Sequence, residues 1–275
     1  MSARSFGQRL TAAVAAHGRL CVGIDPHPAL LAQWELTDDA DGLEAFAMTC
    51  VEALAGHVAV VKPQSAFFER HGSAGIAVLE RVLAAFDGGP TVTILDAKRG
   101  DIGSTMDGYA DAYLGVKAPL GADAITLSPY LGFGSLLPAL DTAADAGRGV
   151  FVLARTSNPD GVAVQLAEFG GRGTAQSIVD DAAARNAGIE PLGDVGVVVG
   201  ATRDHGLDLS ALNGPVLAPG LGAQGARPAD VAEYFADVNG LVLPSASRSV
   251  LKAGPDMATL RAAAEALRDE LVALG

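Results

Sequence analysis

The sequence predicts an α/β protein, a closed (β/α)8 TIM barrel that forms one domain over residues 1–275. Short, β-branched apolar segments recur eight times along the chain, which is typical of parallel strands buried on both faces. Helical patterns lie between most of these segments, as in strand–helix–strand repeats. Eight such units in 275 residues favour a closed barrel over an open, doubly wound sheet.

The predicted strands are short segments rich in Val, Ile and Leu. Because their apolar character is nearly continuous, we expect each strand to be covered both inside the barrel and by the outer helices. The predicted strands span residues 20–25, 58–62, 91–96, 124–128, 150–155, 195–200, 215–219 and 240–244.

The predicted helices have apolar residues at spacings of three and four. Residues 43–55 show this pattern with Leu43, Phe46, Cys50 and Leu54, which would line one buried helix face. A strand followed by a helix is thus expected eight times. The other helical patterns lie at residues 75–86, 230–235 and 258–274.

Residues 157–194 form the longest stretch between two predicted strands. They contain a polar, glycine-rich piece at residues 168–174 and then a helix-like run to Ala187. A connection of this length is either a mobile functional loop or an ordinary surface insertion, and the sequence leaves both open.

Composition and charge exclude several classes of protein. Hydrophobic residues make up 49% of the chain and charged residues 19%, which excludes disorder. No apolar run approaches the roughly 18 residues of a membrane helix, and the first ten residues lack the apolar segment of a secretory signal. The net charge of −13 argues against nucleic acid and anionic membranes as partners, because both require a cationic face. Two cysteines are too few for a disulfide framework, and they lack the clustered Cys/His spacing of a zinc site, so we expect a cytoplasmic protein.

The active site of this fold forms at the carboxyl ends of the strands. The segment LDAKRGDI after the third strand carries Asp96 and Lys98, which lie two residues apart and therefore point to the same face of an extended segment. In isolation this pair would be an ordinary strand-end ion pair. Asp25 and Lys62 end the first two strands, however, and buried charges cost energy unless neighbours neutralise them. The gathering of these four charged side chains at the carboxyl end of one barrel favours a functional site.

A second cluster follows the seventh and eighth predicted strands, at residues 218–225 (APGLGAQG) and 244–248 (PSASR). TIM barrels commonly bind phosphate with these two loops. Glycines let backbone N–H groups approach an anion, Gln224 offers an amide, and Arg248 offers a planar fork for phosphate oxygens. The alternative is that the glycines only turn the chain and Arg248 pairs with a surface carboxylate. The two-loop arrangement favours a phosphate site.

Together these residues resemble the orotidine 5′-phosphate decarboxylase family, and in particular its longer bacterial (type 2) subfamily, over essentially the whole chain. The most specific match is LDAKRGDIGST at residues 95–105, which is similar to the family's D-x-K-x-x-D-I…T signature. The other matching positions are Asp25 in GIDP, Lys62 in VKPQ, Ser157 in RTSNPDG, Gln224 in GLGAQG and Arg248 in SASR.

The resemblance implies decarboxylation of orotidine 5′-phosphate to UMP in pyrimidine synthesis, without a metal or an organic cofactor. Lys62, Asp96, Lys98 and Asp101 would form an alternating network of charges. In that network Asp96 would face the substrate carboxylate, and Lys98 would protonate C6 of the pyrimidine as carbon dioxide leaves.

The resemblance also implies a homodimer, in which Asp101, Ile102 and Thr105 cross the interface to complete the partner's site. The remaining site residues would bind the substrate. Their implied roles are ribose binding for Asp25 and Lys62, pyrimidine binding for Ser157, and phosphate binding for Gln224 and Arg248.

Two other functions stay open. A metal-dependent decarboxylase or aldolase of the same superfamily, acting on a keto-sugar phosphate, shares the D-x-K-x-x-D motif. It carries a carboxylate where this chain has Lys62, and a cation there would repel a divalent metal. A non-catalytic, nucleotide-binding barrel would keep the fold, although every charged position that catalysis requires is present in this chain.

Overall fold

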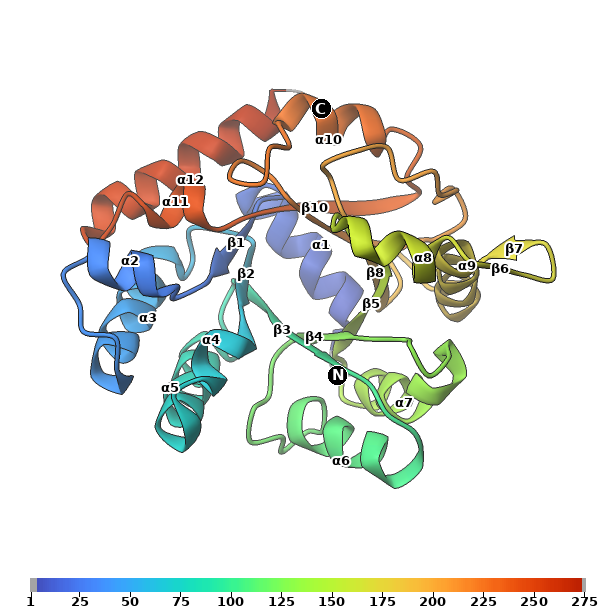
Figure 1. Cartoon of the computed structure of the whole chain (residues 1–275), viewed down its shortest axis with the longest axis horizontal. Coiled ribbons are helices and arrows are strands. Elements are labelled where there is room, and N and C mark those ends of the chain that lie inside the picture. Colours follow the sequence, from blue (N-terminus) through green and yellow to red (C-terminus); the bar gives the residue numbers. More distant parts are fainter. Residues whose placement is uncertain (1–3, 274–275) are drawn as a thin grey trace.

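Eight parallel strands close into a barrel in the computed structural model, which describes residues 4–273 (Figure 1). The order around the ring is β1-β10-β9-β8-β5-β4-β3-β2, so the strands follow each other as they do in the sequence. The predicted closed barrel is therefore confirmed. The strands of the barrel are β1 (Cys21–Ile24), β2 (Val60–Pro63), β3 (Val92–Arg99), β4 (Ala124–Leu127), β5 (Gly149–Arg155), β8 (Val195–Val199), β9 (Gly214–Pro219) and β10 (Gly240–Ala246).

Helices surround the barrel, and their apolar faces form one core with the outward-facing strand residues. The four helical patterns correspond to α3 (Ala40–Leu54), α5 (Gly72–Phe86), α10 (Pro228–Tyr234) and α12 (Met257–Val272). The last of these ends at Val272, and residue 274 of its predicted range lies outside the described residues. The helices after β1 are α2 (Pro28–Gln33), α3 (Ala40–Leu54), α4 (Ser65–Glu69), α5 (Gly72–Phe86), α6 (Gly103–Tyr113), α7 (Leu137–Asp145), α8 (Val162–Gln165), α9 (Thr174–Asn186), α10 (Pro228–Tyr234), α11 (Arg248–Leu251) and α12 (Met257–Val272), with 3-10 turns at Phe133–Leu136 and Pro159–Gly161.

The helix α1 (Phe6–His17) lies before the first strand, where no helix was predicted, and closes the amino-terminal end of the barrel. It begins with a capping box between Ser5 and Gln8. Its Phe6 ring packs edge-to-face on Phe151 of β5, with ring centroids 6.0 Å apart. Gly149 leaves the room that Phe6 needs, because a Cβ there would lie 2.3 Å from the ring. The packing of Phe6 on Phe151 therefore fills the amino-terminal end of the barrel interior.

The expectation of a helix after every strand was wrong at one place. Residues 200–213 join β8 to β9 without a helix. The side chains of Asp204 and Asp208 accept hydrogen bonds from the backbone N–H groups of Gly206 and Ser210, at 2.9 and 3.0 Å. Such local side-chain bonds compete with helix formation and stabilise turns instead.

The long segment 157–194 contains α8, a small hairpin of β6 (Glu168–Phe169) and β7 (Arg172–Gly173), and then α9. The hairpin projects from the outside of the barrel in Figure 1. Gln165 ties the segment to the end of β5, since its amide oxygen accepts from the N–H of Thr156 at 3.0 Å. Motion of this segment stays a prediction.

No helix within residues 4–273 is long and apolar enough to cross a membrane.

Candidate active site

A cavity of about 520 Å³ lies at the carboxyl ends of the barrel strands. This volume is typical of pockets for small molecules. Polar side chains from loops and strand ends far apart in the sequence converge on it, because the barrel brings those ends together. The predicted site residues that line it are Asp25, Lys62, Asp96, Lys98, Ser157, Gln224 and Arg248.

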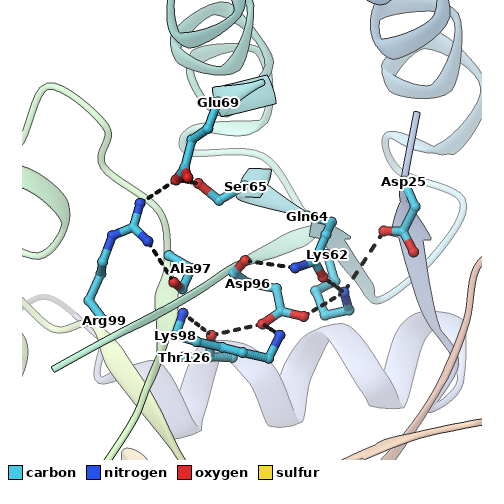
Figure 2. Close-up of polar contacts among 10 residues, drawn as sticks. All are labelled: Asp25, Lys62, Gln64, Ser65, Glu69, Asp96, Ala97, Lys98, Arg99 and Thr126. Carbon is cyan, nitrogen blue, oxygen red and sulfur yellow. Dashed lines mark hydrogen bonds and ion pairs between the residues drawn. The ribbon is translucent and has the colours of Figure 1, made fainter. Parts of the chain in front are cut away.

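Four charged side chains form a continuous row along one wall of this cavity (Figure 2). The Nζ atom of Lys62 lies 3.9 Å from Asp25 Oδ1 and 3.0 Å from Asp96 Oδ2. The other carboxylate oxygen of Asp96 lies 2.6 Å from Lys98 Nζ. The charges thus alternate in sign, and Asp96 and Lys98 meet at the salt-bridge distance that their spacing predicts.

The network fixes the charge of its central members. Burial by itself raises the pKa of Asp96, but the ammonium groups of Lys62 and Lys98 outweigh it and hold that pKa well below its usual value. Burial by itself lowers the pKa of Lys62, but the carboxylates of Asp96 and Asp25 outweigh it and raise that pKa. Both groups therefore stay ionised at neutral pH.

These shifts predict how stability depends on pH. The pKa of Asp96 is below its ordinary value of 3.8, so its contribution is complete above that value and is lost as pH falls through the folded-state pKa. The pKa of Lys62 is above its ordinary value of 10.5, so its contribution to stability is complete below that value and is lost as pH rises through the folded-state pKa.

We expect Asp96→Asn to lower the free energy of unfolding by about 3 kcal/mol, equally from about pH 5 to pH 9, and by less toward pH 3. Urea denaturation of both proteins across this range measures the difference, and a change between pH 5 and pH 9 would contradict the prediction.

Two neutral side chains that were not predicted hold the charged row in place. The hydroxyl of Thr126 donates to Asp96 Oδ1 at 2.9 Å and accepts from the backbone N–H of Lys98 at 2.9 Å. The amide of Gln64 donates to the carbonyl of Asp96 at 3.3 Å and accepts from Lys62 Nζ at 3.2 Å. Sequence reasoning missed Thr126 and Gln64 because it searched the strand ends for charged side chains. The one signal for Gln64 was its position two residues after Lys62.

The loop after β9 brings Gln224 to the cavity. Gly220 and Gly222 have φ values of 121° and 76°, which favour glycine. The N–H of Leu221 donates to the carbonyl of Ser245 on β10 at 3.3 Å, so the loop lies against the strand that leads to Arg248. Within residues 4–273 Arg248 forms no ion pair, so the alternative of a surface carboxylate partner is not realised there.

Ser157 lies on the cavity wall after β5, where Arg203 Nη2 donates to its carbonyl at 2.7 Å. Asp101, Ile102 and Thr105 lie elsewhere and do not line the cavity of their own chain. Asp101 Oδ1 accepts from the N–H of Ile102 at 2.8 Å, and residue Ile102 is 62% exposed. Their role across a dimer interface stays a prediction.

No metal-binding cluster was identified around these residues. In the part of the chain from residue 4 to residue 273, no three His, Cys, Asp or Glu side chains are grouped closely enough to hold a metal ion. The carboxylates at the cavity, Asp25 and Asp96, each face an ammonium group instead.

Comparison with known proteins places the chain in a family. The model of the orotidine 5′-phosphate decarboxylase / HUMPS family matches residues 18–263. An orotidine 5′-phosphate decarboxylase of Salinispora arenicola is 60% identical over 95% of both chains, and one of Streptomyces coelicolor is 54% identical over 97% of this chain and 96% of its own. The solved OMP decarboxylase of Leishmania donovani is 31% identical, with a TM-score of 0.75 over 98% of both chains. The barrel, the row of alternating charges and these similarities together show that the chain belongs to the orotidine 5′-phosphate decarboxylase / HUMPS family.

Proposed function

We propose that this chain decarboxylates orotidine 5′-phosphate to UMP and carbon dioxide in pyrimidine synthesis. The observation that carries the proposal is the row Asp25–Lys62–Asp96–Lys98, which lines a cavity that also holds Gln224 and Arg248. Such a cavity offers a fixed ammonium group for the reacting carbon, and for a phosphate it offers a guanidinium that forms no ion pair with residues 4–273. The activity named for the 60% identical relative is the same.

Lys98 is the proton donor in this mechanism. Loss of carbon dioxide breaks the bond from C6 to the carboxylate carbon and leaves the electron pair on C6, where no conjugated group can accept it. The ammonium of Lys98 stabilises that charge and transfers its proton to C6, which gives UMP and a neutral amine that solvent reprotonates. Asp96 holds Lys98 Nζ at 2.6 Å and faces the departing carboxylate.

The other side chains orient the substrate. Asp25 Oδ1 is buried without a hydrogen-bond donor, so a ribose hydroxyl is a suitable partner, with Lys62 beside it. Ser157 contacts the pyrimidine. Gln224 and Arg248 bind the phosphate, and the binding energy of that remote group is expressed in the transition state. The chain acts as a single barrel domain over residues 1–275, in the cytoplasm and as a homodimer.

The activity test is the loss of substrate absorbance when purified protein is added to orotidine 5′-phosphate with excess chelator. We expect full turnover, because Lys98 supplies the charge that a metal ion would otherwise supply. A strict requirement for magnesium would favour the metal-dependent alternative. Binding of UMP without turnover of orotidine 5′-phosphate would favour the non-catalytic barrel.

The dimer is tested by mixing two inactive variants, Lys98→Ala and Asp101→Ala. If Asp101 completes the partner's site, each mixed dimer contains one site in which both residues are intact. Half of randomly assembled dimers are mixed, so we expect activity to return to roughly a quarter of the wild-type level. As a control, Lys98→Ala mixed with Asp25→Ala stays inactive, because both residues belong to the same chain's cavity. No recovery in the first mixture would contradict the shared site.

A further inference from the structure

Lys98 has an unusual backbone conformation. Its φ is 49°, in the left-handed region that residues other than glycine rarely adopt. It lies where the pairing of β3 with β4 shifts register, between Leu95 and Arg99. Such irregular conformations persist only where the surroundings enforce them.

The peptide bond that precedes Lys98 is held from two directions. Its N–H, on Lys98, donates to the hydroxyl of Thr126 at 2.9 Å, and its carbonyl, on Ala97, accepts from Nη1 of Arg99 at 2.9 Å. The φ of Lys98 is the rotation about the bond that leaves this peptide plane. Fixing this plane fixes the position of the Lys98 Cα and the direction of the N–Cα bond, and so anchors the base from which the Lys98 side chain leaves the strand.

The guanidinium of Arg99 is itself anchored on two helices. Its Nη2 atom pairs with Glu69 Oε1 of α4, and Glu69 also accepts from the Ser65 hydroxyl at 2.5 Å (Figure 2). The central carbon (Cζ) of the Arg99 guanidinium lies 6.0 and 5.9 Å from the ring centroids of Tyr109 and Tyr113 on α6. Figure 2 shows Arg99 on the Glu69 side of the strand end, away from Lys62.

We propose that Arg99 and Glu69 are positioning residues for Lys98. Neither side chain lines the cavity, so neither touches the substrate there. The pair links the carbonyl of Ala97 to α4 and α6, and this keeps Lys98 Nζ at the place where it can reach C6. The inference rests on the proposed function, because it needs Lys98 to be the proton donor. Displacement of a reacting group by about 1 Å can cost 10²-fold in rate.

The test is Arg99→Met, which removes the guanidinium and keeps an apolar chain against the tyrosines. We expect kcat to fall about 10- to 100-fold, while KM and the affinity for UMP stay within about twofold of wild type. Glu69→Gln removes the charge of the anchor with the same volume, and we expect a smaller fall of the same kind. Arg99→Lys should recover part of the loss, since one ammonium can bond to Glu69 but lacks the fork that also reaches Ala97.

A matched control is Arg185→Met, which removes the ion pair from α9 to Asp141 of α7 (2.6 Å), outside the cavity. Its kcat should equal that of wild type. If Arg99→Met keeps wild-type kcat, or loses kcat only together with UMP affinity and Tm, the pair has a structural role and the inference is overturned. If Arg99→Met does not fold, Glu69→Gln decides by the same criteria. An inactive wild type would overturn the proposed function instead, so the two failures are distinct.

Discussion

Lys98→Ala is expected to lower kcat by at least about 10⁴-fold and to change the affinity for UMP by less than about tenfold. General acid catalysis contributes about 10²–10⁴-fold, and a fixed charge beside the reacting atom contributes about 10²–10³-fold more. UMP has no carboxylate and needs no proton, so it would retain the contacts to Asp25 and Arg248 that we propose. Turnover of orotidine 5′-phosphate and calorimetric titration with UMP measure the two effects.

Lys117→Ala is the control for that experiment, because Lys117 is an exposed lysine that does not line the cavity. We expect it to keep wild-type kcat. If Lys98→Ala also turned over orotidine 5′-phosphate at the normal rate, the proton would come from another group and the proposed mechanism would be wrong.

The double variant Gln224→Ala/Arg248→Ala is expected to lower kcat/KM for orotidine 5′-phosphate by about 10³-fold. A hydrogen bond to a charged group contributes about 1.5–3 kcal/mol, and both side chains would bond to the phosphate dianion. Because Arg248 forms no ion pair within residues 4–273, its substitution leaves no buried carboxylate unpaired there. The fold should therefore keep its Tm.

The nucleoside orotidine, which lacks the phosphate, separates binding of that group from general damage to the site. Wild type and the double variant should have the same kcat/KM for orotidine, since neither can use the phosphate contacts. A comparable fall with both substrates would show that Gln224 and Arg248 act on something other than the phosphate.

The sequence by itself determined the eight barrel strands, because buried parallel strands need nearly continuous apolar segments. It also identified seven of the residues that line the cavity, namely Asp25, Lys62, Asp96, Lys98, Ser157, Gln224 and Arg248. Asp25, Lys62 and Asp96 lie at or just after the ends of apolar strands, and a barrel brings all those ends to one face. The spacing of two residues between Asp96 and Lys98 predicted that their side chains lie on the same face, and these side chains meet at 2.6 Å.

Only the tertiary structure decided what depends on contacts between distant segments. The helix α1 closes the amino-terminal end of the barrel because Phe6 packs on Phe151. No local sequence pattern predicts that contact between distant segments. Thr126 and Gln64 are neutral side chains whose importance comes from their distance to Asp96 and Lys62. The left-handed backbone of Lys98 likewise lies at a register shift between β3 and β4. Lysine itself does not favour this conformation, so it depends on the tertiary contacts around the residue.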